Sequence, residues 1–105
     1  MGGRLDATYA ALSHPIRREM IERLRTEGAR VMDLATGFDV SLAAASKHIQ
    51  VLEGAGLIDR IVRGRVHHLS LDPEPLAAAA GWIDTYREFW ERRLDALDRL
   101  MREDR

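Results

Sequence analysis

The order of apolar and polar residues predicts helices over most of the chain and one short pair of strands. Apolar residues recur at intervals of three and four, the helical period, in four early stretches. These helices are expected at 4–13, 15–24, 31–38 and 42–54. β-Branched residues then crowd two runs, 57–62 and 66–71, and the three residues centred on Gly64 between them predict a hairpin. Helical spacing returns over 74–102 and predicts one long last helix.

Residues that start or stop helices support these boundaries. Pro15 suits the first turn of a helix, where its missing N–H is not needed. Ser41 can accept a hydrogen bond from an exposed N–H of the next first turn, so it is a good N-cap. Gly28 and Gly54 stand where the second and fourth helical patterns stop.

The segment 31–71 therefore reads as helix, tight turn, helix and hairpin. This order is typical of a winged helix-turn-helix fold, which places one helix in the DNA major groove. We predict a single domain over residues 1–105, mainly α with a small β-hairpin. Within it, 31–56 form the helix-turn-helix and 57–71 the wing.

The helix expected at 42–54 has one apolar and one small, mildly polar face. The apolar face holds Ala45, Ile49 and Leu52, and the other face holds Leu42, Ala43, Ser46, Lys47 and Gln50. Ser46 and Gln50 can hydrogen-bond base edges, and Lys47 can reach guanine or a phosphate. An ordinary amphipathic surface helix has the same pattern, so the interpretation depends on the neighbouring helix and hairpin.

Charge supports the same interpretation modestly. The chain as a whole carries −1, but residues 41–71 carry four cationic side chains against Glu53 and Asp59. Arg63 and Arg65 flank Gly64 at the expected hairpin tip, where guanidinium groups suit phosphates or a narrow minor groove. A solvated turn whose charges discourage edge pairing remains the alternative.

Composition limits the other functional classes. The absence of cysteine excludes disulfides, thiolate catalysis and thiolate metal sites, and fits a reducing cytoplasm. No stretch approaches the ~20 apolar residues that would span a membrane. No carboxylate pair, glycine-rich phosphate loop or nucleophile with a placed base indicates an enzyme. We expect a cytoplasmic protein, associated with the nucleoid when bound to DNA, with neither catalytic activity nor a cofactor.

Four strings together resemble the ArsR/SmtB family of bacterial winged-helix repressors. They are ALSHPIRREMIERL at 11–24, DLA at 33–35, SLAAASKHIQVLEGAGLI at 41–58 and RGRVHHLSL at 63–71. The resemblance implies a homodimer that binds an operator upstream of its own gene and leaves it when a signal arrives. It also implies DNA-binding roles for Arg17, Ser41, Ala43, Ser46, Lys47, His48, Arg63 and Arg65, to which the outer face adds Gln50. Leu42 departs from the glutamine common in such helices, and His48 has two open roles, a phosphate contact or packing under the helix.

The metal sites typical of this family are not expected here. Arg30 and Met32 stand where metal-sensing members often carry a cysteine pair. Asp84 near the last helix is followed by no histidine. His67 and His68 are neighbours in a strand and point to opposite faces, so they cannot chelate one ion together. The chain is therefore interpreted as a member of a metal-independent branch.

The helices at 4–13 and 74–102 carry a long aromatic and aliphatic stripe that a small domain has little core to cover. Aromatic residues concentrate at protein interfaces, so the stripe predicts a dimer interface. Its residues are Leu5, Tyr9, Leu12, Trp82, Tyr86, Phe89, Trp90, Leu94 and Leu97. Packing of the stripe on its own domain is the alternative. A pocket between paired helices, lined by Trp82, Tyr86 and Trp90, is a further hypothesis for an unknown small-molecule inducer.

The predicted function is a sequence-specific, double-stranded DNA-binding regulator, a dimeric repressor of its own operon. The alternative is a winged-helix module that binds another protein and no DNA. The net charge of −1 and the few hydrogen-bonding groups around Leu42–Ala45 support that alternative.

Overall fold

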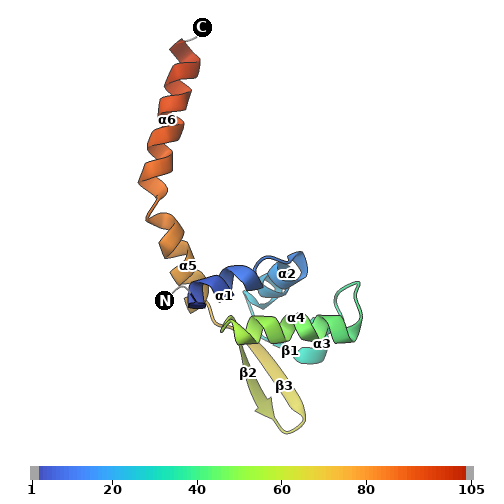
Figure 1. Ribbon diagram of the computed structural model, residues 1–105. Coiled ribbons are helices and arrows are strands. Elements are labelled where there is room, and N and C mark those ends of the chain that lie inside the picture. Colours follow the sequence, from blue (N-terminus) through green and yellow to red (C-terminus); the bar gives the residue numbers. More distant parts are fainter. Residues whose placement is uncertain (1–2, 104–105) are drawn as a thin grey trace.

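A computed structural model describes residues 3–103 and shows a small helical body, a β-hairpin and a projecting C-terminal helix (Figure 1). The elements are α1 (Gly3–Ala11), α2 (Pro15–Leu24), β1 (Ala29–Arg30), α3 (Val31–Ala35), α4 (Leu42–Gly54), β2 (Ile58–Arg63), β3 (Val66–Leu71), α5 (Glu74–Asp84) and α6 (Arg87–Glu103). The prediction of a mainly α chain with a small β-hairpin is confirmed. The predicted domain limits include residues 1–2 and 104–105, which lie outside the described residues.

One core joins α2, α3, α4 and the hairpin. Met20, Leu34 and Ile49 come from the three helices, and Leu57 and Leu69 come from the base and inner face of the hairpin. All five side chains are almost fully buried. Burying an aliphatic side chain of this size stabilises a fold by about 1.5–3 kcal/mol. The helix-turn-helix and the hairpin are therefore held together by shared apolar contacts.

Side-chain and glycine caps set the ends of α4. Ser41 Oγ accepts a hydrogen bond from the backbone N–H of Ala44 at 3.1 Å, as the sequence predicted. At the other end, Gly56 has φ +77°, and the backbone N–H of Leu57 donates to the carbonyl of Leu52 at 3.0 Å. This is a Schellman motif, which ends a helix and turns the chain back sharply. It directs Leu57 into the core and starts β2.

The sheet has three antiparallel strands in the order β1-β3-β2. The sequence did not predict β1, because two residues are too few to show a strand pattern. Ala29 pairs with Leu69 and Arg30 with His68. Arg63 pairs with Val66, so the hairpin turn has two residues, Gly64 and Arg65, rather than the three expected. Gly64 has φ +62°, which a tight hairpin turn requires at its first position.

Three predicted helix boundaries are wrong. The first helix, expected to end at residue 13, ends at Ala11. α3 ends at Ala35 rather than at Phe38, and the ring of Phe38 instead packs against the core beneath the guanidinium of Arg23. The predicted helix over 74–102 is interrupted after Asp84, so α5 and α6 are separate helices. The Thr85 hydroxyl donates to the carbonyl of Trp82 at 2.6 Å, a local bond that competes with regular helix geometry.

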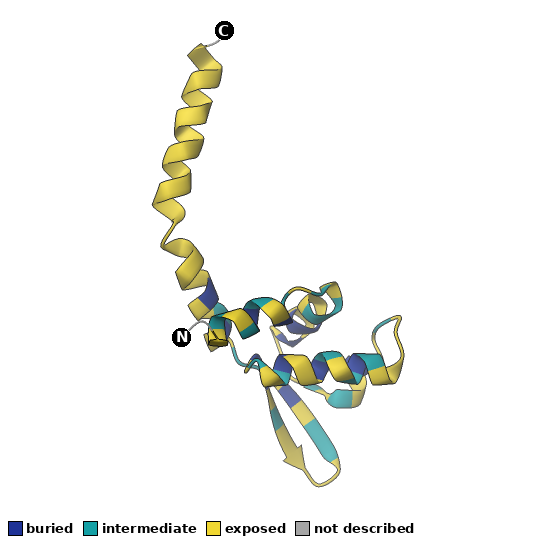
Figure 2. Ribbon diagram, viewed as in Figure 1, coloured by how far each residue is buried: buried dark blue, intermediate teal, exposed yellow. Residues whose placement is uncertain are grey.

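α5 starts on the helical body and α6 leaves it (Figure 1). Pro75 and Ala79 are buried, and the Tyr9 hydroxyl of α1 donates to the carbonyl of Ala79 at 3.2 Å. From Ala80 to Glu103 every residue is exposed (Figure 2). The molecule measures 66 × 32 × 23 Å as a result. The alternative that the C-terminal stripe packs on its own domain is therefore wrong.

Gly28→Ala tests how closely the chain approaches β3. A Cβ atom at residue 28 would lie 2.8 Å from the backbone carbonyl oxygen of Leu69, so β1 or β3 must shift. We expect the free energy of unfolding to fall by roughly 1–3 kcal/mol, the usual cost of overpacking, in urea denaturation. Gly54→Ala is the control, because nothing lies within 4 Å of its added Cβ. Equal stabilities of the two variants would contradict the close approach.

Candidate nucleic-acid interface

The outer face of α4 is the accessible surface of the helix-turn-helix. Leu42, Ala43, Lys47 and Gln50 are exposed, and Ser46 is half-buried (Figure 2). The opposite face holds Ala45, Ile49 and Leu52, all buried in the core. The core therefore fixes the rotation of α4, and small or mildly polar side chains face outward. A helix with such a surface can enter the major groove without steric hindrance.

Ser41 begins this surface, and its hydroxyl is partly used by the fold. Its Oγ accepts the hydrogen bond from Ala44, which leaves the hydroxyl hydrogen able to donate. The first-turn N–H groups of α4 lie beside it, and a helix N-terminus favours anions such as phosphate. Ser41 thus combines a structural cap with a donor at the exposed start of α4.

Arg17 is largely occupied within the protein. Its Nε donates to the carbonyl of Ala11 at 2.6 Å, and one terminal nitrogen lies 3.1 Å from the carbonyl of Ala10. The other terminal nitrogen lies 3.1 Å from Nδ1 of His48. A guanidinium has five N–H donors, so two remain for a phosphate. Arg17 caps the C-terminal end of α1 and connects it to α4.

His48 lies half-buried between α4 and α2 rather than on the outer face of α4. Its ring centroid is 4.3 Å from that of His14, whose Nδ1 accepts from the Ile16 N–H and caps α2. Burial lowers the pKa of His48, and the charges of His14 and Arg17 lower it further. Of the two roles left open for His48, the geometry favours packing under the helix.

The wing presents two exposed guanidinium groups at its tip. Arg63 and Arg65 are exposed on either side of Gly64, at the end of the hairpin farthest from the helical body (Figure 1). Ile61 and Val62 are also exposed on β2. The tip is therefore free to contact a surface beside the one that α4 meets.

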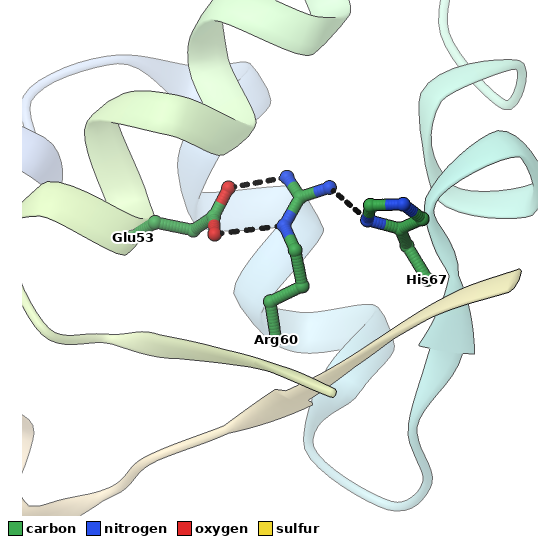
Figure 3. A network of polar contacts seen from close by, with 3 residues as sticks. All are labelled: Glu53, Arg60 and His67. Carbon is green, nitrogen blue, oxygen red and sulfur yellow. Dashed lines mark hydrogen bonds and ion pairs between the residues drawn. The ribbon is translucent and has the colours of Figure 1, made fainter. Parts of the chain in front are cut away.

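A polar network that sequence analysis did not predict fixes the wing to α4 (Figure 3). Arg60 of β2 makes two hydrogen bonds to the Glu53 carboxylate of α4, Nε to Oε2 at 2.9 Å and a terminal nitrogen to Oε1 at 2.5 Å. The other terminal nitrogen lies 2.9 Å from Nδ1 of His67 on β3. The hydrogen bonds from Arg60 lower the pKa of Glu53, and Glu53 in turn raises that of Arg60. The pair holds both partners charged and sets the angle between the wing and α4.

The residues predicted for the dimer interface divide into two groups. Leu5 and Tyr9 are half-buried, and Leu12 is half-buried and packs against the core of its own chain. The exposed group lies on α5, α6 and the turn between them and comprises Trp82, Tyr86, Phe89, Trp90, Leu94 and Leu97. A hollow of about 250 Å³ lies among the aromatic residues from Trp82 to Trp90, which include the three predicted to line an inducer pocket.

Neither a metal site nor a membrane span is found among residues 3–103. Within residues 3–103, no three His, Cys, Asp or Glu side chains gather where they could hold a metal ion. None of the described helices is both long and apolar enough to cross a membrane.

Lowering the pH should destabilise the fold through His48. Its pKa is lower in the folded than in the unfolded chain, so the unfolded chain binds the proton first as the pH falls. The free energy of unfolding should therefore decrease below about pH 6.5, the ordinary histidine pKa, and level off below the folded pKa. Urea denaturation at several pH values measures this, and His48→Gln should flatten the dependence. The exposed His68→Gln is the control, and an identical pH profile in all three proteins would contradict the assignment.

Comparison with known proteins identifies the same fold and class. A helix-turn-helix domain family matches residues 12–61. The HTH-type transcriptional regulator Rv2034 of Mycobacterium tuberculosis is 34% identical over 91% of this chain and 87% of its own length. The transcriptional repressor SdpR of Bacillus subtilis is 25% identical over 75% of this chain and 88% of its own length. RHA00566, whose crystal structure is described as that of an ArsR family transcriptional regulator, is 35% identical in sequence to this chain. The two structures superpose with a TM-score of 0.80 over 87% of this chain and 94% of that one. The chain belongs to the ArsR family of winged helix-turn-helix, DNA-binding transcriptional regulators.

Proposed function

We propose that the protein binds operator DNA as a homodimer and represses its own operon. The observation that carries this proposal is the outward face of α4. Its small side chains are exposed, its opposite face is packed into the core, and the cationic wing lies beside it. SdpR, which is similar over most of its length, is described as a repressor. Binding to DNA also implies a location in the bacterial cytoplasm, with the nucleoid.

The proposed DNA contacts are of two kinds: contacts to base edges, which give sequence specificity, and contacts to the phosphate backbone, which hold the protein in place. Ser46, Lys47 and Gln50 reach base edges from α4, and Ala43 contacts a thymine methyl group. Ser41 donates to a phosphate at the start of α4, and Arg63 and Arg65 contact phosphates or the minor groove. Arg17 adds a phosphate contact only through the two donors that the fold leaves it. His48 acts by positioning α4.

The proposed dimer covers the exposed apolar residues of the C-terminal segment. Trp82, Phe89 and Leu94 are each at least 51% exposed, and the stripe continues to Met101. A contiguous apolar surface of this length marks an interface rather than a solvated face. A two-fold dimer would place two α4 helices about 34 Å apart, so the operator should be an imperfect palindrome with half-sites one turn apart or a small multiple. The hollow from Trp82 to Trp90 is the proposed place for an inducer between paired helices.

Lys47→Ala and Arg65→Ala should each weaken operator binding about five- to tenfold, because each removes a phosphate or base contact from both protomers. Fluorescence anisotropy with DNA from upstream of the protein's own gene measures the affinity. For a dimer with about six phosphate contacts, the log–log salt slope should be near −5. Arg102→Ala, at the far end of α6, is the matched control. A flat salt dependence, or no DNA binding at all, would reject this function in favour of a protein-binding module.

Trp90→Ala should shift the protein from dimer to monomer at micromolar concentration, since large aromatic residues dominate interface energies. Sedimentation equilibrium measures the shift. Arg92→Ala is the control, because residue 92 lies about 200° round α6 from residue 90 and already pairs with Glu88. A dimer that Trp90→Ala leaves intact would show that the stripe is not the interface.

A further inference from the structure

A cleft of about 440 Å³ opens between the start of α3 and the hairpin. Its volume falls within the range of small-molecule sites, roughly 300–1,000 Å³. It lies on the other part of the molecule from the aromatic hollow of α5 and α6, and the two share no residue. We call it the wing cleft.

Cationic side chains dominate the polar lining of the wing cleft. Arg30, Arg60 and Arg65 all border it. Arg60 is neutralised by Glu53, whereas Arg30 and Arg65 are exposed and form no ion pair with any other residue between 3 and 103. Asp33 also borders the cleft. Counting these charges leaves one net positive charge, which matches a monoanion and not a polyphosphate.

His67 adds a directed donor to this lining. Its Nδ1 lies 2.9 Å from a terminal nitrogen of Arg60, which can only donate, so Nδ1 accepts. With Nδ1 accepting, Nε2 is the ring nitrogen that carries a hydrogen and can donate to a ligand oxygen. Two residues of the network drawn in Figure 3, Arg60 and His67, thus also line the wing cleft.

The rest of the lining is apolar. Val31, Met32 and Val66 border the cleft, and the side chain of Met32 is 55% exposed. An exposed, flexible methionine adapts to apolar ligands of varied shape. These side chains offer nothing to a DNA phosphodiester, so the composition favours a free small molecule with an apolar body.

We propose that the wing cleft binds a small amphipathic monoanion, such as a monocarboxylate with an aliphatic or aromatic body, that weakens operator binding. The carboxylate lies between Arg30 and Arg65, and the apolar body rests on Met32. Arg65 is also a proposed DNA contact of the wing tip, so the ligand and the DNA backbone compete for one guanidinium. By thermodynamic linkage, a ligand that weakens DNA binding is itself bound more weakly by the DNA complex. This effect on DNA rests on the proposed function, whereas binding to the cleft does not.

Methionine-methyl NMR with octanoate as the probe tests the site on the full-length protein without DNA. Met32 reports on the cleft, while the buried Met20 and the distant Met101 of α6 are internal references. Octanoate should shift the Met32 signal saturably and leave the other two in place. Octanamide, which has the same chain without the charge, should not. Arg30→Gln and Arg65→Gln should each weaken octanoate binding at least about fivefold, and Arg102→Gln should not.

Two outcomes of the same NMR titration would overturn the proposal of an anion site in the wing cleft. A Met32 signal that octanoate does not move, or that octanamide moves equally, would remove the anion site. A Met32 signal that moves with operator DNA but not with octanoate would make the cleft a phosphate contact of the DNA surface and also overturn it. If octanoate binds, it should raise the dissociation constant for operator DNA in the wild type but not in Arg30→Gln. If the protein binds no DNA, the NMR result still decides the cleft, so the two proposals fail separately.

Discussion

The burial of one face of α4 is the constraint on which the rest of this structure depends. Ala45, Ile49 and Leu52 are each 1% exposed or less, and they pack between α2, α3 and the hairpin. Rotating α4 by even a fraction of a turn would expose these side chains and bury Lys47. The Schellman motif at Gly56 then turns the chain so that the wing starts from the end of the same helix. Core packing therefore decides both which face of α4 is exposed and where the wing lies beside it.

Two polar links complete this positioning at opposite sides of α4. Arg17 joins the carbonyls that end α1 to His48 of α4, and Arg60 joins Glu53 of α4 to His67 of the wing. In each, an arginine supplies several donors in a fixed plane, which lysine could not do. Each histidine ring accepts at Nδ1 from the neighbouring guanidinium, which can only donate. Half-buried charged networks of this kind add directional restraint to a core that is otherwise only apolar.

The C-terminal segment, unlike the helical body, is almost entirely exposed. α5 is anchored through Pro75, Ala79 and the hydroxyl of Tyr9, after which no residue is buried. Its outer side carries charge pairs such as Arg92 with Glu88, which contribute little to stability when exposed. Its apolar stripe touches the helical body at Trp82, whose ring lies edge-on to that of Tyr9 with centroids 6.3 Å apart, and its side chains stay exposed from there to Met101. A helix that is polar on one side and apolar on the other gains stability from packing rather than from propensity, so this segment is suited to association with a second copy.

The sequence by itself determined the elements whose side chains repeat in a local pattern. The helices at 15–24 and 42–54 and the inward face of α4 follow from periodicity, because a helix exposes one face and buries the other. The Ser41 cap of α4 follows from its hydroxyl, whereas the sequence did not predict His14 as the cap of α2. Tertiary structure alone decided β1, the early end of α3 and the partners of Arg17, His48 and Arg60. A two-residue strand exists only because β3 offers it hydrogen bonds. Likewise, residues seven or thirty-one positions apart meet only after the core has brought their helices and strands together. Local periodicity indicates which face of a helix is buried. Which residues cover that face depends on contacts between segments far apart in the chain, and no short stretch of sequence contains those contacts.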